Sequence, residues 1–457
     1  YSYNILNQRL KNIIFFLKIK KIKKQRIAIL LDQGFDYGSV LTAIPLSQNV
    51  AVPLSKSWKS FENEKVINFL ECGYIITDLS KINDLKVKLV CRFHNLFLFK
   101  TNVKNISISK NSDAIILLSS GTTGKPKGVV LTKNSITNNV NDVIKYLKLK
   151  ENDRSLIHTP TCYAFSVSQT LTHLMAGACL YPFSKIIFPG EILKVIKKNY
   201  LTGLTGPPAS FKILTDIANN KFPSIRYCQV GGTPFSLDLA IKIRKTFPNS
   251  KILNVYGCSE NSPRVSFFYL KKKLTKGLDK NGYYCVGGGV AGTKIKIFNK
   301  TKKSEEGEIL IKGNSLMSRY WKNQILTKKK IINGYFNTGD IGYIFKKNLY
   351  LSGRKDFIIN MGNQKIMPDE VENVLNKHPM IKDAVVYKIA DRDNMLGSIP
   401  VANIVLKKKL DINLIFEFCS RYLSNYKIPK KFFLVSKIKK NLYGKIERKY
   451  YNARFKK

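Results

Sequence analysis

Cysteine and histidine are scarce in this sequence of 457 residues. Its eight cysteines form no CxxC pair, and only four histidines accompany them. Because a zinc site needs closely spaced Cys and His ligands, few candidates for such a site exist here. Scattered, unpaired cysteines are typical of buried thiols in a reducing compartment.

Long apolar runs are also missing. The longest, such as residues 13–17 and 27–31, are far shorter than the roughly 20 residues that span a bilayer. We therefore expect no membrane span and a soluble, cytoplasmic protein. No signal peptide is visible, and the chain begins with Tyr1 in place of Met, which leaves open an upstream segment.

Acidic residues are outnumbered: 30 Asp and Glu stand against 78 Lys and Arg, a net charge of +48. Most of the basic residues are lysines, spread from end to end among abundant Ile and Asn. A protein that grips nucleic-acid phosphates draws heavily on Arg, whose fork matches phosphate oxygens. We therefore attribute the charge to an AT-rich genome that places lysines on solvated faces, and we expect no nucleic-acid partner.

The first half of the chain alternates between two hydrophobic periodicities. Helices are expected over residues 6–17, 38–46, 61–71, 135–148, 164–176, 190–198 and 236–246. Buried strands are expected over residues 26–31, 51–52 and 74–77. Alternation of this kind predicts a mainly parallel sheet that is covered by helices.

The pattern changes after residue 283. Short alternating strands, such as 294–298 and 307–311, are broken by glycines and indicate a barrel-like subdomain. A compact α+β stretch follows, with helices over 368–376 and 410–423 and strands over 383–389 and 400–406. We predict an α/β protein in which residues 1–355 form a large N-terminal domain of packed αβ layers with the barrel-like subdomain. Residues 356–457 form a small mobile C-terminal domain.

The most informative run is residues 115–132, IILLSSGTTGKPKGVVLT. Glycine backbone N–H groups, hydroxyls and two lysines follow a buried strand, which is a suitable combination for holding a polyphosphate. The run is not a P-loop, because Gly124-Lys125 is followed by Pro126 and the position five before Gly124 is Ser119.

This run resembles the glycine-rich phosphate loop of the acyl-adenylate-forming superfamily, the AMP-binding enzymes that include acyl-CoA synthetases, adenylation domains and luciferases. Further motifs follow in the family's order, namely NVYGCSE (254–260), YFNTGDIG (335–342), GRKDFIINMG (353–362) and GKIER (444–448). The resemblance covers essentially the whole chain. It implies an ATP-dependent ligase that forms an acyl-adenylate from a small-molecule carboxylic acid and passes the acyl group to coenzyme A. The alternative acceptor is the phosphopantetheine of an acidic carrier protein, which a basic surface would attract.

The resemblance also implies how ATP and Mg²⁺ are bound. Glu260 is the implied magnesium ligand, Asp340 accepts both ribose hydroxyls, and Arg354 adds a ribose or phosphate contact. The other implied nucleotide contacts are Ser119, Ser120, Gly121, Thr122, Thr123, Gly124, Lys127, Gly232, Thr233, Tyr256, Gly257 and Ser259. Thr123 and Glu260 are counted as catalytic together with Lys445.

In the family, the lysine that aligns with Lys445 bridges the attacking carboxylate and the α-phosphate, where a cation offsets their repulsion. The preceding residues 439–443 read KKNLY, whereas the family usually has Pro and Thr before the Gly-Lys pair. The small domain is implied to turn about Asp356. A glycine that the family often carries in the thiol-delivering loop is replaced by Asn363, with Gly362 one residue earlier; Asn tolerates left-handed backbone angles.

Residues 160–178 correspond to the helix that lines the acyl pocket in this family. Where amino-acid-activating relatives carry an aspartate, this chain has Ala164, which cannot compensate a buried ammonium, so an α-amino acid is disfavoured. A fatty or aromatic acid suits the expected lining, which is Tyr163, Phe165, Val230, Gly231 and Cys258.

Two other function classes are weighed against the ligase. A degenerate member of the family would bind nucleotide without catalysis, and a nucleic-acid binder would show salt-sensitive retention on DNA. His158 and His173 are interpreted as core histidines and not as general bases.

Overall fold

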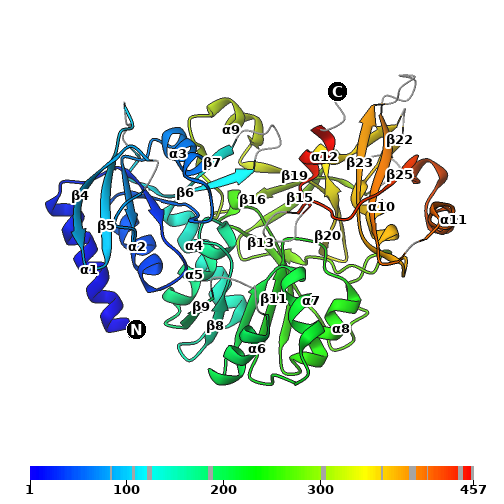
Figure 1. The fold of residues 1–457 in the computed structure, drawn as a ribbon, viewed down its shortest axis with the longest axis horizontal. Helices are drawn as coiled ribbons and strands as arrows, with labels where there is room; N and C mark the ends of the chain where they lie inside the picture. Colours follow the sequence, from blue (N-terminus) through cyan, green and yellow to red (C-terminus); the bar gives the residue numbers. More distant parts are fainter. Residues whose placement is uncertain are drawn as a thin grey trace.

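The computed structural model describes residues 1–82, 85–104, 109–120, 126–183, 189–299, 305–361, 364–390, 398–408, 410–440 and 446–453. Two large sheets with their helices, a half-barrel of antiparallel strands and a small C-terminal part are arranged around a common centre (Figure 1). In Figure 1 the C-terminal part, in orange and red, lies at the opposite end of the molecule from the N-terminal helix.

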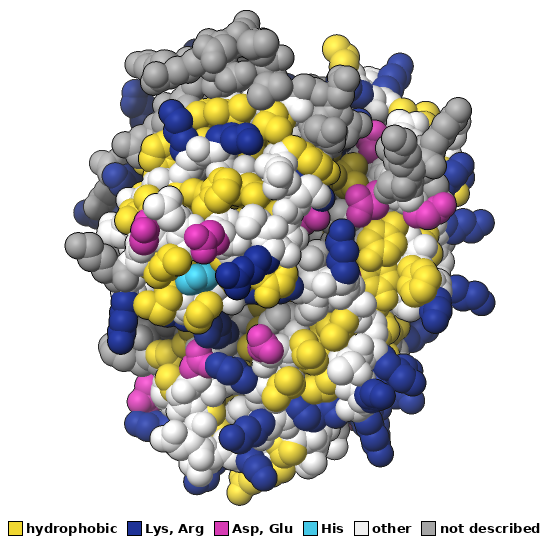
Figure 2. Space-filling view, turned by 90° about the vertical axis from the view of Figure 1, so that its right-hand side faces the viewer, with side chains coloured by type: hydrophobic (Ala, Val, Ile, Leu, Met, Phe, Trp, Pro, Cys, Tyr) yellow, Lys and Arg dark blue, Asp and Glu magenta, His cyan; other side chains and the backbone are white. Residues whose placement is uncertain are grey.

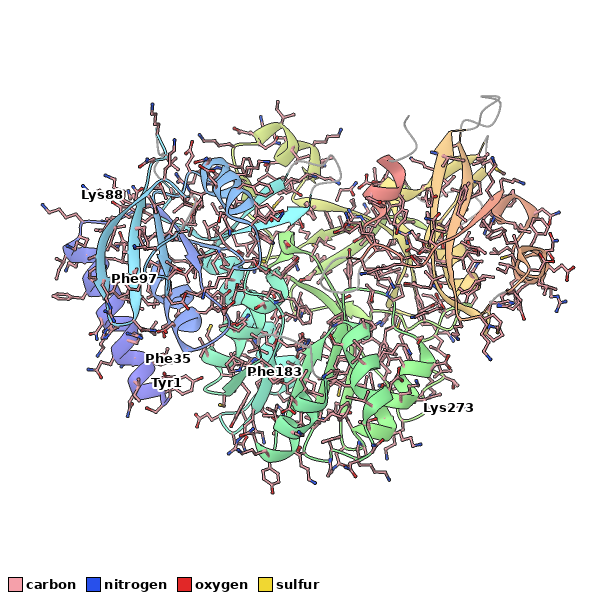
Figure 3. All side chains as sticks on the ribbon, viewed as in Figure 1. Tyr1, Phe35, Lys88, Phe97, Phe183 and Lys273 are labelled. Atoms are coloured by element: carbon pink, nitrogen blue, oxygen red, sulfur yellow. The ribbon has the colours of Figure 1, made fainter. Side chains whose placement is uncertain are left out.

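The first sheet has eight strands in the order β17-β7-β6-β2-β1-β3-β5-β4. They are β1 (Arg26–Leu30), β2 (Val50–Pro53), β3 (Tyr74–Thr77), β4 (Val87–Phe93), β5 (Leu96–Thr101), β6 (Asp113–Ser120), β7 (Pro126–Thr132) and β17 (Arg319–Tyr320). Its centre is parallel, and the strands at both edges are antiparallel. Its helices are α1 (Tyr3–Ile19), α2 (Phe35–Leu46) and α3 (Ser60–Phe69). The Tyr1 ring stacks on Phe35 at the start of α2, with centroids 4.0 Å apart (Figure 3).

The second sheet has seven strands in the order β14-β13-β12-β11-β10-β8-β9. They are β8 (Arg154–Ile157), β9 (Cys179–Pro182), β10 (Gly203–Gly206), β11 (Tyr227–Gly231), β12 (Lys251–Gly257), β13 (Arg264–Tyr269) and β14 (Gly288–Gly289). Its helices are α4 (Lys133–Leu147), α5 (Ala164–Met175), α6 (Pro189–Lys198), α7 (Pro208–Ile217) and α8 (Leu237–Thr246). One face packs on α4 and α5 through Tyr227 and Leu253, and the other packs on α6, α7 and α8 through Cys228 and Ile252. This side-to-side alternation along the strands separates two cores.

The half-barrel contains β15 (Lys294–Phe298), β16 (Gly307–Lys312), β18 (Ile331–Ile332), β19 (Tyr335–Phe345) and β20 (Asn348–Arg354), with α9 (Gln324–Lys330) beside it. The C-terminal part contains β21 (Ile359–Met361), β22 (Gln364–Ile366), β23 (Ile381–Ala390), β24 (Ser398–Leu406) and β25 (Lys431–Leu434). Its helices are α10 (Pro368–Leu375), α11 (Ile412–Tyr422) and α12 (Arg448–Ala453). The predicted fold class, including the barrel-like subdomain and the small α+β part, is confirmed.

Most predicted elements are present within a few residues of their expected ends, but several helices and strands were not predicted. Among them are α7, which follows directly on Pro207, and the hairpin β4–β5, whose lysines mask its alternation. The buried strand expected from residue 115 is present as β6, whereas its hairpin partner β7 was not predicted. Pairing with a neighbouring strand stabilises such elements more than their local sequence pattern does. The strands β6 and β7, for example, pair along their whole length.

The cysteines and the basic side chains are distributed in the structure as the sequence composition suggests. All eight cysteines are free, and five of them are buried. On the face shown in Figure 2, basic side chains are scattered among hydrophobic and uncharged ones. In the described part of the chain, no helix has both the length and the apolar character needed to cross a bilayer.

Candidate active site

The phosphate-loop motif connects the antiparallel strands β6 and β7. Ser119 and Ser120 end β6, and Ser119 is the register partner of Lys127 near the start of β7. The predicted contacts Gly121, Thr122, Thr123 and Gly124 lie outside the described residues. Next to the motif, Gly128 has no room for a side chain, because a Cβ there would lie 2.7 Å from Leu70 and 2.9 Å from Trp321. The strand that carries Lys127 is therefore packed tightly against its neighbours.

The ends of β11 and β12 supply the second part of the site. The two strands are parallel neighbours, so Gly231 and Gly257 end at the same edge of the sheet. A Cβ on Gly231 would lie 2.6 Å from the carbonyl oxygen of Val255, and a Cβ on Gly257 would overlap that of Pro263. Gly232 follows with a φ of 97°, a left-handed angle that glycine adopts without strain. Backbone therefore approaches closely at the edge where Thr233 and Ser259 also lie.

Asp340 and Arg354 are register partners across β19 and β20. Arg354 Nη1 donates to Asp340 Oδ1 at 3.0 Å, and the Tyr256 hydroxyl donates to the other oxygen of the same carboxylate. Burial acts to lower the pKa of Arg354, but Asp340 and Asp356 outweigh it and raise that pKa above its usual range. Burial first, and then the charge of Asp340, raises the pKa of Tyr256 well above its usual value. The half-barrel and the second sheet thus hold this carboxylate from two sides.

Glu260 lies in the short turn after β12 and contacts the first sheet. The Tyr320 hydroxyl, on β17, donates to Glu260 Oε1 at 2.8 Å, and burial followed by the charge of Glu260 raises the pKa of Tyr320. The backbone carbonyl of Glu260 accepts from the N–H of Met317 at 2.8 Å. Among the described residues no hydrogen bond reaches the second carboxylate oxygen of Glu260, so a hard oxygen ligand remains available. In the described part of the chain, no group of three His, Cys, Asp or Glu side chains could hold a metal ion.

Two lysines approach the same place from different elements. Lys127 Nζ lies 5.7 Å from the centroid of the Tyr320 ring. Lys330 ends α9, and its ammonium would lie 3.5 Å from a Cβ on Gly339. Burial lowers the pKa of Lys330; Asp356 opposes this change, whereas Lys127 and Arg354 add to it. A cluster of three cations therefore lies beside the carboxylates of Glu260 and Asp340.

The residues expected to line the acyl pocket are distributed over both faces of the second sheet. Tyr163 precedes α5 and Phe165 lies in its first turn, while Cys258 follows β12. Val230 is fully buried and packs toward α7 and α8. Gln229, one residue earlier on β11, faces α4 and donates to the Tyr146 hydroxyl at 2.6 Å.

Only some residues of the two C-terminal motifs are among the described residues. Asp356 lies in the turn between β20 and the C-terminal strands, with its Oδ2 3.7 Å from Arg354 Nη2. Arg448 ends the last motif and pairs with Asp369 and Glu372 of α10. Gly362, Asn363 and Lys445 lie outside the described residues, so their predicted roles stay predictions.

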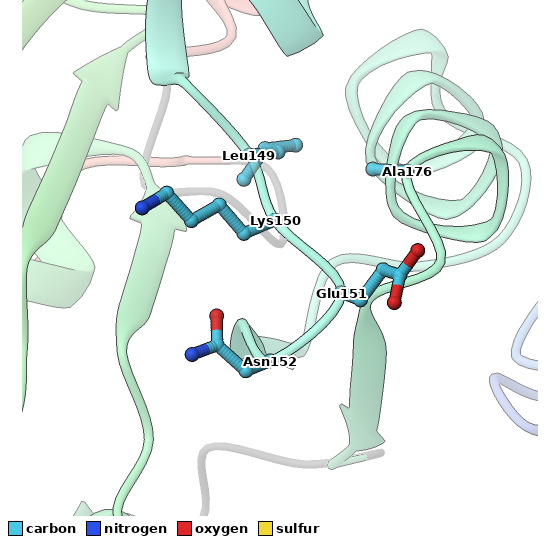
Figure 4. Close-up of a pocket in the computed structure, with 5 residues that line it drawn as sticks. All are labelled: Leu149, Lys150, Glu151, Asn152 and Ala176. Atoms are coloured by element: carbon cyan, nitrogen blue, oxygen red, sulfur yellow. The ribbon is translucent and has the colours of Figure 1, made fainter.

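Of the two histidines predicted to be core residues, His173 is fully buried and His158 is partly buried. Burial lowers the pKa values of His158 and His173 to about 4. His173 lies between the carbonyl of Gln169 and the hydroxyl of Tyr227, each at 2.8 Å. An open hollow where the chain leaves α4 (Figure 4) contains none of the predicted site residues and is lined by Leu149, Lys150, Glu151, Asn152 and Ala176.

Comparison with known proteins decides the family. The sequence profile of the AMP-binding enzymes matches residues 1–321, and that of the AMP-binding enzyme C-terminal domain matches residues 370–445. The chain belongs to the AMP-binding enzyme family. The predicted family and the predicted ATP-dependent acid–thiol ligase are thereby confirmed.

Several curated relatives carry one name. The 2-succinylbenzoate–CoA ligase of Bacillus licheniformis is 30% identical over 348 residues, which cover 75% of this chain and 70% of the relative. Its namesake from Bacillus subtilis is 28% identical over 386 residues, which cover 82% and 77%. Among solved structures, o-succinylbenzoate CoA synthetase (MenE) from Bacillus subtilis with its acyl-adenylate intermediate superimposes with a TM-score of 0.81 at 24% identity, covering 97% of this chain and 91% of that one. A fatty acyl CoA synthetase from Mycobacterium tuberculosis has a TM-score of 0.72 at 20% identity, covering 100% and 93%, so both structures show the same fold.

Three residues that contact the candidate site were missed by sequence reasoning, namely Tyr320, Lys330 and Thr338. Thr338 positions Asp340, because its Oγ1 accepts from the backbone N–H of Asp340 at 3.0 Å. The TGD motif at 338–340 could have indicated Thr338. Lys330 ends a run of three lysines, and no local signal separates it from the other two.

Proposed function

We propose that this AMP-binding enzyme is a 2-succinylbenzoate–CoA ligase, which activates an aromatic acid with ATP and Mg²⁺. The observation that carries the chemistry is the convergence of Asp340, Glu260 and three cations at one edge of the second sheet. The choice of acid rests on the curated relatives, whose printed substrate is aromatic. An aromatic acid is therefore favoured over the fatty acid that was equally expected.

The nucleotide is oriented by the half-barrel. Asp340 offers two carboxylate oxygens to the two ribose hydroxyls, and Arg354 keeps that carboxylate in place. Lys127 and Lys330 offset the charge of the phosphates. When bound, Mg²⁺ withdraws charge from the phosphate oxygens, and Glu260 is the carboxylate placed to hold it.

Adenylation joins the acid to AMP. An oxygen of the substrate carboxylate attacks the α-phosphorus, the bond to the bridging β-phosphate oxygen breaks, and pyrophosphate leaves. Two anions must meet in this step, and we assign Lys445 the role of lying between them. We propose Thr123 and the rest of the phosphate loop as the backbone and hydroxyl donors to the leaving pyrophosphate.

Thioester formation completes the reaction. The thiol sulfur attacks the carbonyl carbon, the bond to the AMP oxygen breaks, AMP leaves, and the thiol proton passes to solvent. We propose coenzyme A as the thiol, with Asp356 as the point about which residues 356–457 turn between the steps. A carrier protein is the alternative acceptor, supported by the net charge of +48. We place the enzyme in the cytoplasm, where ATP and coenzyme A are supplied.

An acid panel tests the proposed function. Purified protein receives ATP, Mg²⁺ and one acid at a time, with and without coenzyme A, and pyrophosphate and acyl-CoA are measured. We expect pyrophosphate and the CoA thioester with 2-succinylbenzoate, and weaker or no turnover with fatty acids. Turnover only after addition of a carrier protein would contradict coenzyme A as the acceptor, and turnover with fatty acids alone would contradict the assigned acid.

The role of Lys445 has its own test. Lys445→Ala should lower pyrophosphate release by about 100-fold or more, while ATP binding measured by calorimetry changes little. Lys437→Ala is the matched control, because Lys437 is an exposed lysine of the same part of the chain. Equal rates of adenylation in the two variants would contradict the assignment and favour a binding protein without catalysis.

A further inference from the structure

The Tyr320 side chain joins two parts of the candidate site that belong to different sheets. Tyr320 lies on β17, at the edge of the first sheet, where it is the register partner of Val129 on β7. Its ring is only 3% exposed and packs in the largest hydrophobic core. Its hydroxyl donates to Glu260 Oε1 at 2.8 Å, in the turn that follows β12 of the second sheet. One buried side chain of the first sheet therefore contacts the carboxylate that is proposed to hold Mg²⁺.

The strand β17 has only two residues, yet several contacts fix its position. The backbone N–H groups of Ser318 and Trp321 donate to carbonyls of β7 at 2.9 and 2.7 Å. Arg319 makes two hydrogen bonds to the buried carboxylate of Asp113 on β6, at 3.0 and 2.7 Å. A bidentate pair of this kind restricts both the distance and the orientation of its members. The Tyr320 hydroxyl is therefore carried by a rigid support.

The turn that contains Glu260 is attached to the same segment through its backbone. The carbonyl of Glu260 accepts from the N–H of Met317, and the Ser262 hydroxyl donates to the carbonyl of Ser315, each at 2.8 Å. These bonds hold the turn but leave the Glu260 side chain free to rotate. The bond from Tyr320 is the one that orients the carboxylate, because it occupies Oε1 and leaves the other oxygen available.

The Tyr320 hydroxyl also lies close to the phosphate loop. Lys127, on the strand that follows the loop, places its Nζ 5.7 Å from the centroid of the Tyr320 ring. Burial, followed by the charge of Glu260, raises the pKa of Tyr320, so the hydroxyl stays protonated and acts as a donor. Mg²⁺ requires nearly ideal octahedral geometry with oxygen ligands at about 2.0–2.1 Å. A carboxylate that is fixed relative to the phosphate-loop strand meets this requirement better than one that rotates.

We propose that Tyr320 is a positioning residue, whose hydroxyl fixes the Glu260 carboxylate and leaves its second oxygen for the Mg²⁺ that accompanies ATP. The inference rests on the proposed function and deepens it, since it concerns the metal ligand of the same site. Groups that orient a metal ligand typically change metal affinity by about 10- to 100-fold when they are removed. Tyr320 acts through Glu260 and takes no part in the bonds that form and break.

Calorimetry of ATP binding, with Mg²⁺ and with EDTA, tests this role in the wild type and in Tyr320→Phe. Phe keeps the ring, and with it the core packing and the contact with Lys127, but it lacks the hydroxyl. We expect the affinity for ATP to fall about 10- to 100-fold in the presence of Mg²⁺ and to change little in EDTA. The Mg²⁺ concentration that gives half the maximal rate of pyrophosphate release should rise by a similar factor.

Tyr284→Phe is the matched control. Tyr284 is also a buried tyrosine, but its hydroxyl donates to the carbonyl of Leu274 at 2.6 Å, in the core that the second sheet shares with α6, α7 and α8. This variant likewise loses one hydroxyl and one hydrogen bond. Its affinity for ATP should equal that of the wild type, both with Mg²⁺ and in EDTA.

A double-mutant cycle with Glu260→Gln shows whether Tyr320 acts through this carboxylate. If it does, adding Tyr320→Phe to Glu260→Gln should lower the affinity for ATP with Mg²⁺ by less than about twofold, because the interaction is already lost. A further fall as large as the one in the wild-type background would contradict the inference.

The other outcomes separate this inference from the proposed function. An affinity of Tyr320→Phe equal to that of the wild type with Mg²⁺, or an equal loss with and without Mg²⁺, would overturn the role of Tyr320. A fall of about 10 °C or more in melting temperature would indicate a structural role and would also contradict it. A wild type that binds ATP more tightly with Mg²⁺ but activates no acid would overturn the proposed function and leave the role of Tyr320 intact.

Discussion

Replacing Asp340 by Asn tests whether one carboxylate anchors the nucleotide. Asn has the same shape but no charge and a single acceptor oxygen, so one of the two proposed ribose bonds is lost and the other becomes neutral. A hydrogen bond to a charged group contributes about 1.5–3 kcal/mol, against about 1 kcal/mol for a neutral one. A loss of about 2–3 kcal/mol in binding corresponds to a rise in the KM for ATP of roughly 30- to 150-fold.

The same substitution should change stability much less than binding. Arg354, the partner of Asp340, is 34% exposed and keeps Asp356 at 3.7 Å, so the lost ion pair is worth about 1 kcal/mol or less. For a protein of 457 residues that amounts to about 1 °C in melting temperature. Asp340→Asn should therefore change the KM for ATP strongly and the melting temperature only slightly, so the two effects can be measured separately.

The assay is ATP titration of pyrophosphate release at saturating acid, with melting followed in parallel. Asp216→Asn is the matched control, because Asp216 also bonds two cations, Lys212 and Lys242, but lies on a surface helix away from the site. The control should leave the KM for ATP unchanged. An unchanged KM in Asp340→Asn, or a fall of about 10 °C in its melting temperature, would refute the reasoning.

Three further substitutions or conditions probe the packing, the buried histidines and the cation cluster. Gly231→Ala should lower the free energy of unfolding in urea by about 1–3 kcal/mol, because its Cβ would lie 2.6 Å from a backbone carbonyl oxygen. Gly190→Ala is the control, because nothing lies within 4 Å of a Cβ at that position. Equal effects of the two substitutions would contradict the steric argument. Burial lowers the pKa values of His158 and His173 to about 4, below the usual 6.5. Their contribution to the free energy of unfolding is therefore fully present above pH 6.5. It falls by about 2 kcal/mol per histidine between pH 6.5 and pH 5, because the unfolded chain binds the protons first. Urea unfolding at both pH values should show a smaller fall for His158→Gln, and an identical fall would refute this. Lys330→Met should weaken ATP binding about tenfold in calorimetry, because one cation near the phosphates is lost. The melting temperature should not fall, because the repulsion of Lys330 by Lys127 and Arg354 is relieved. An unchanged affinity for ATP would show that Lys330 does not belong to the site.

The elements with strong local patterns were predictable. The strand β1 is a continuous apolar run and α4 has a clear helical period, so both appear close to their expected limits. The nucleotide motifs were equally readable, because glycines, hydroxyls and carboxylates in that order and spacing match what a polyphosphate and Mg²⁺ require. Gly231 illustrates this well, since close backbone packing at that position excludes any side chain.

Other parts of the site depend on contacts between distant segments. Tyr320 and Glu260 are 60 residues apart and meet only because β17 closes the edge of the first sheet beside the end of β12. Lys330 looks like its neighbours in a lysine run until α9 places it beside Arg354. No periodicity along the chain records such pairings, because they arise from the packing of complete elements.

Local periodicity by itself determined the α/β architecture, and the resemblance of the motifs indicated an AMP-binding enzyme, because both signals lie in consecutive residues. Which buried arginine has no carboxylate partner among the described residues, and which carboxylate two elements hold, was decided only by the tertiary structure. Burial and pairing belong to the surroundings of a side chain, and Arg264 meets Gln229 and Phe165 only when β13, β11 and α5 have packed together.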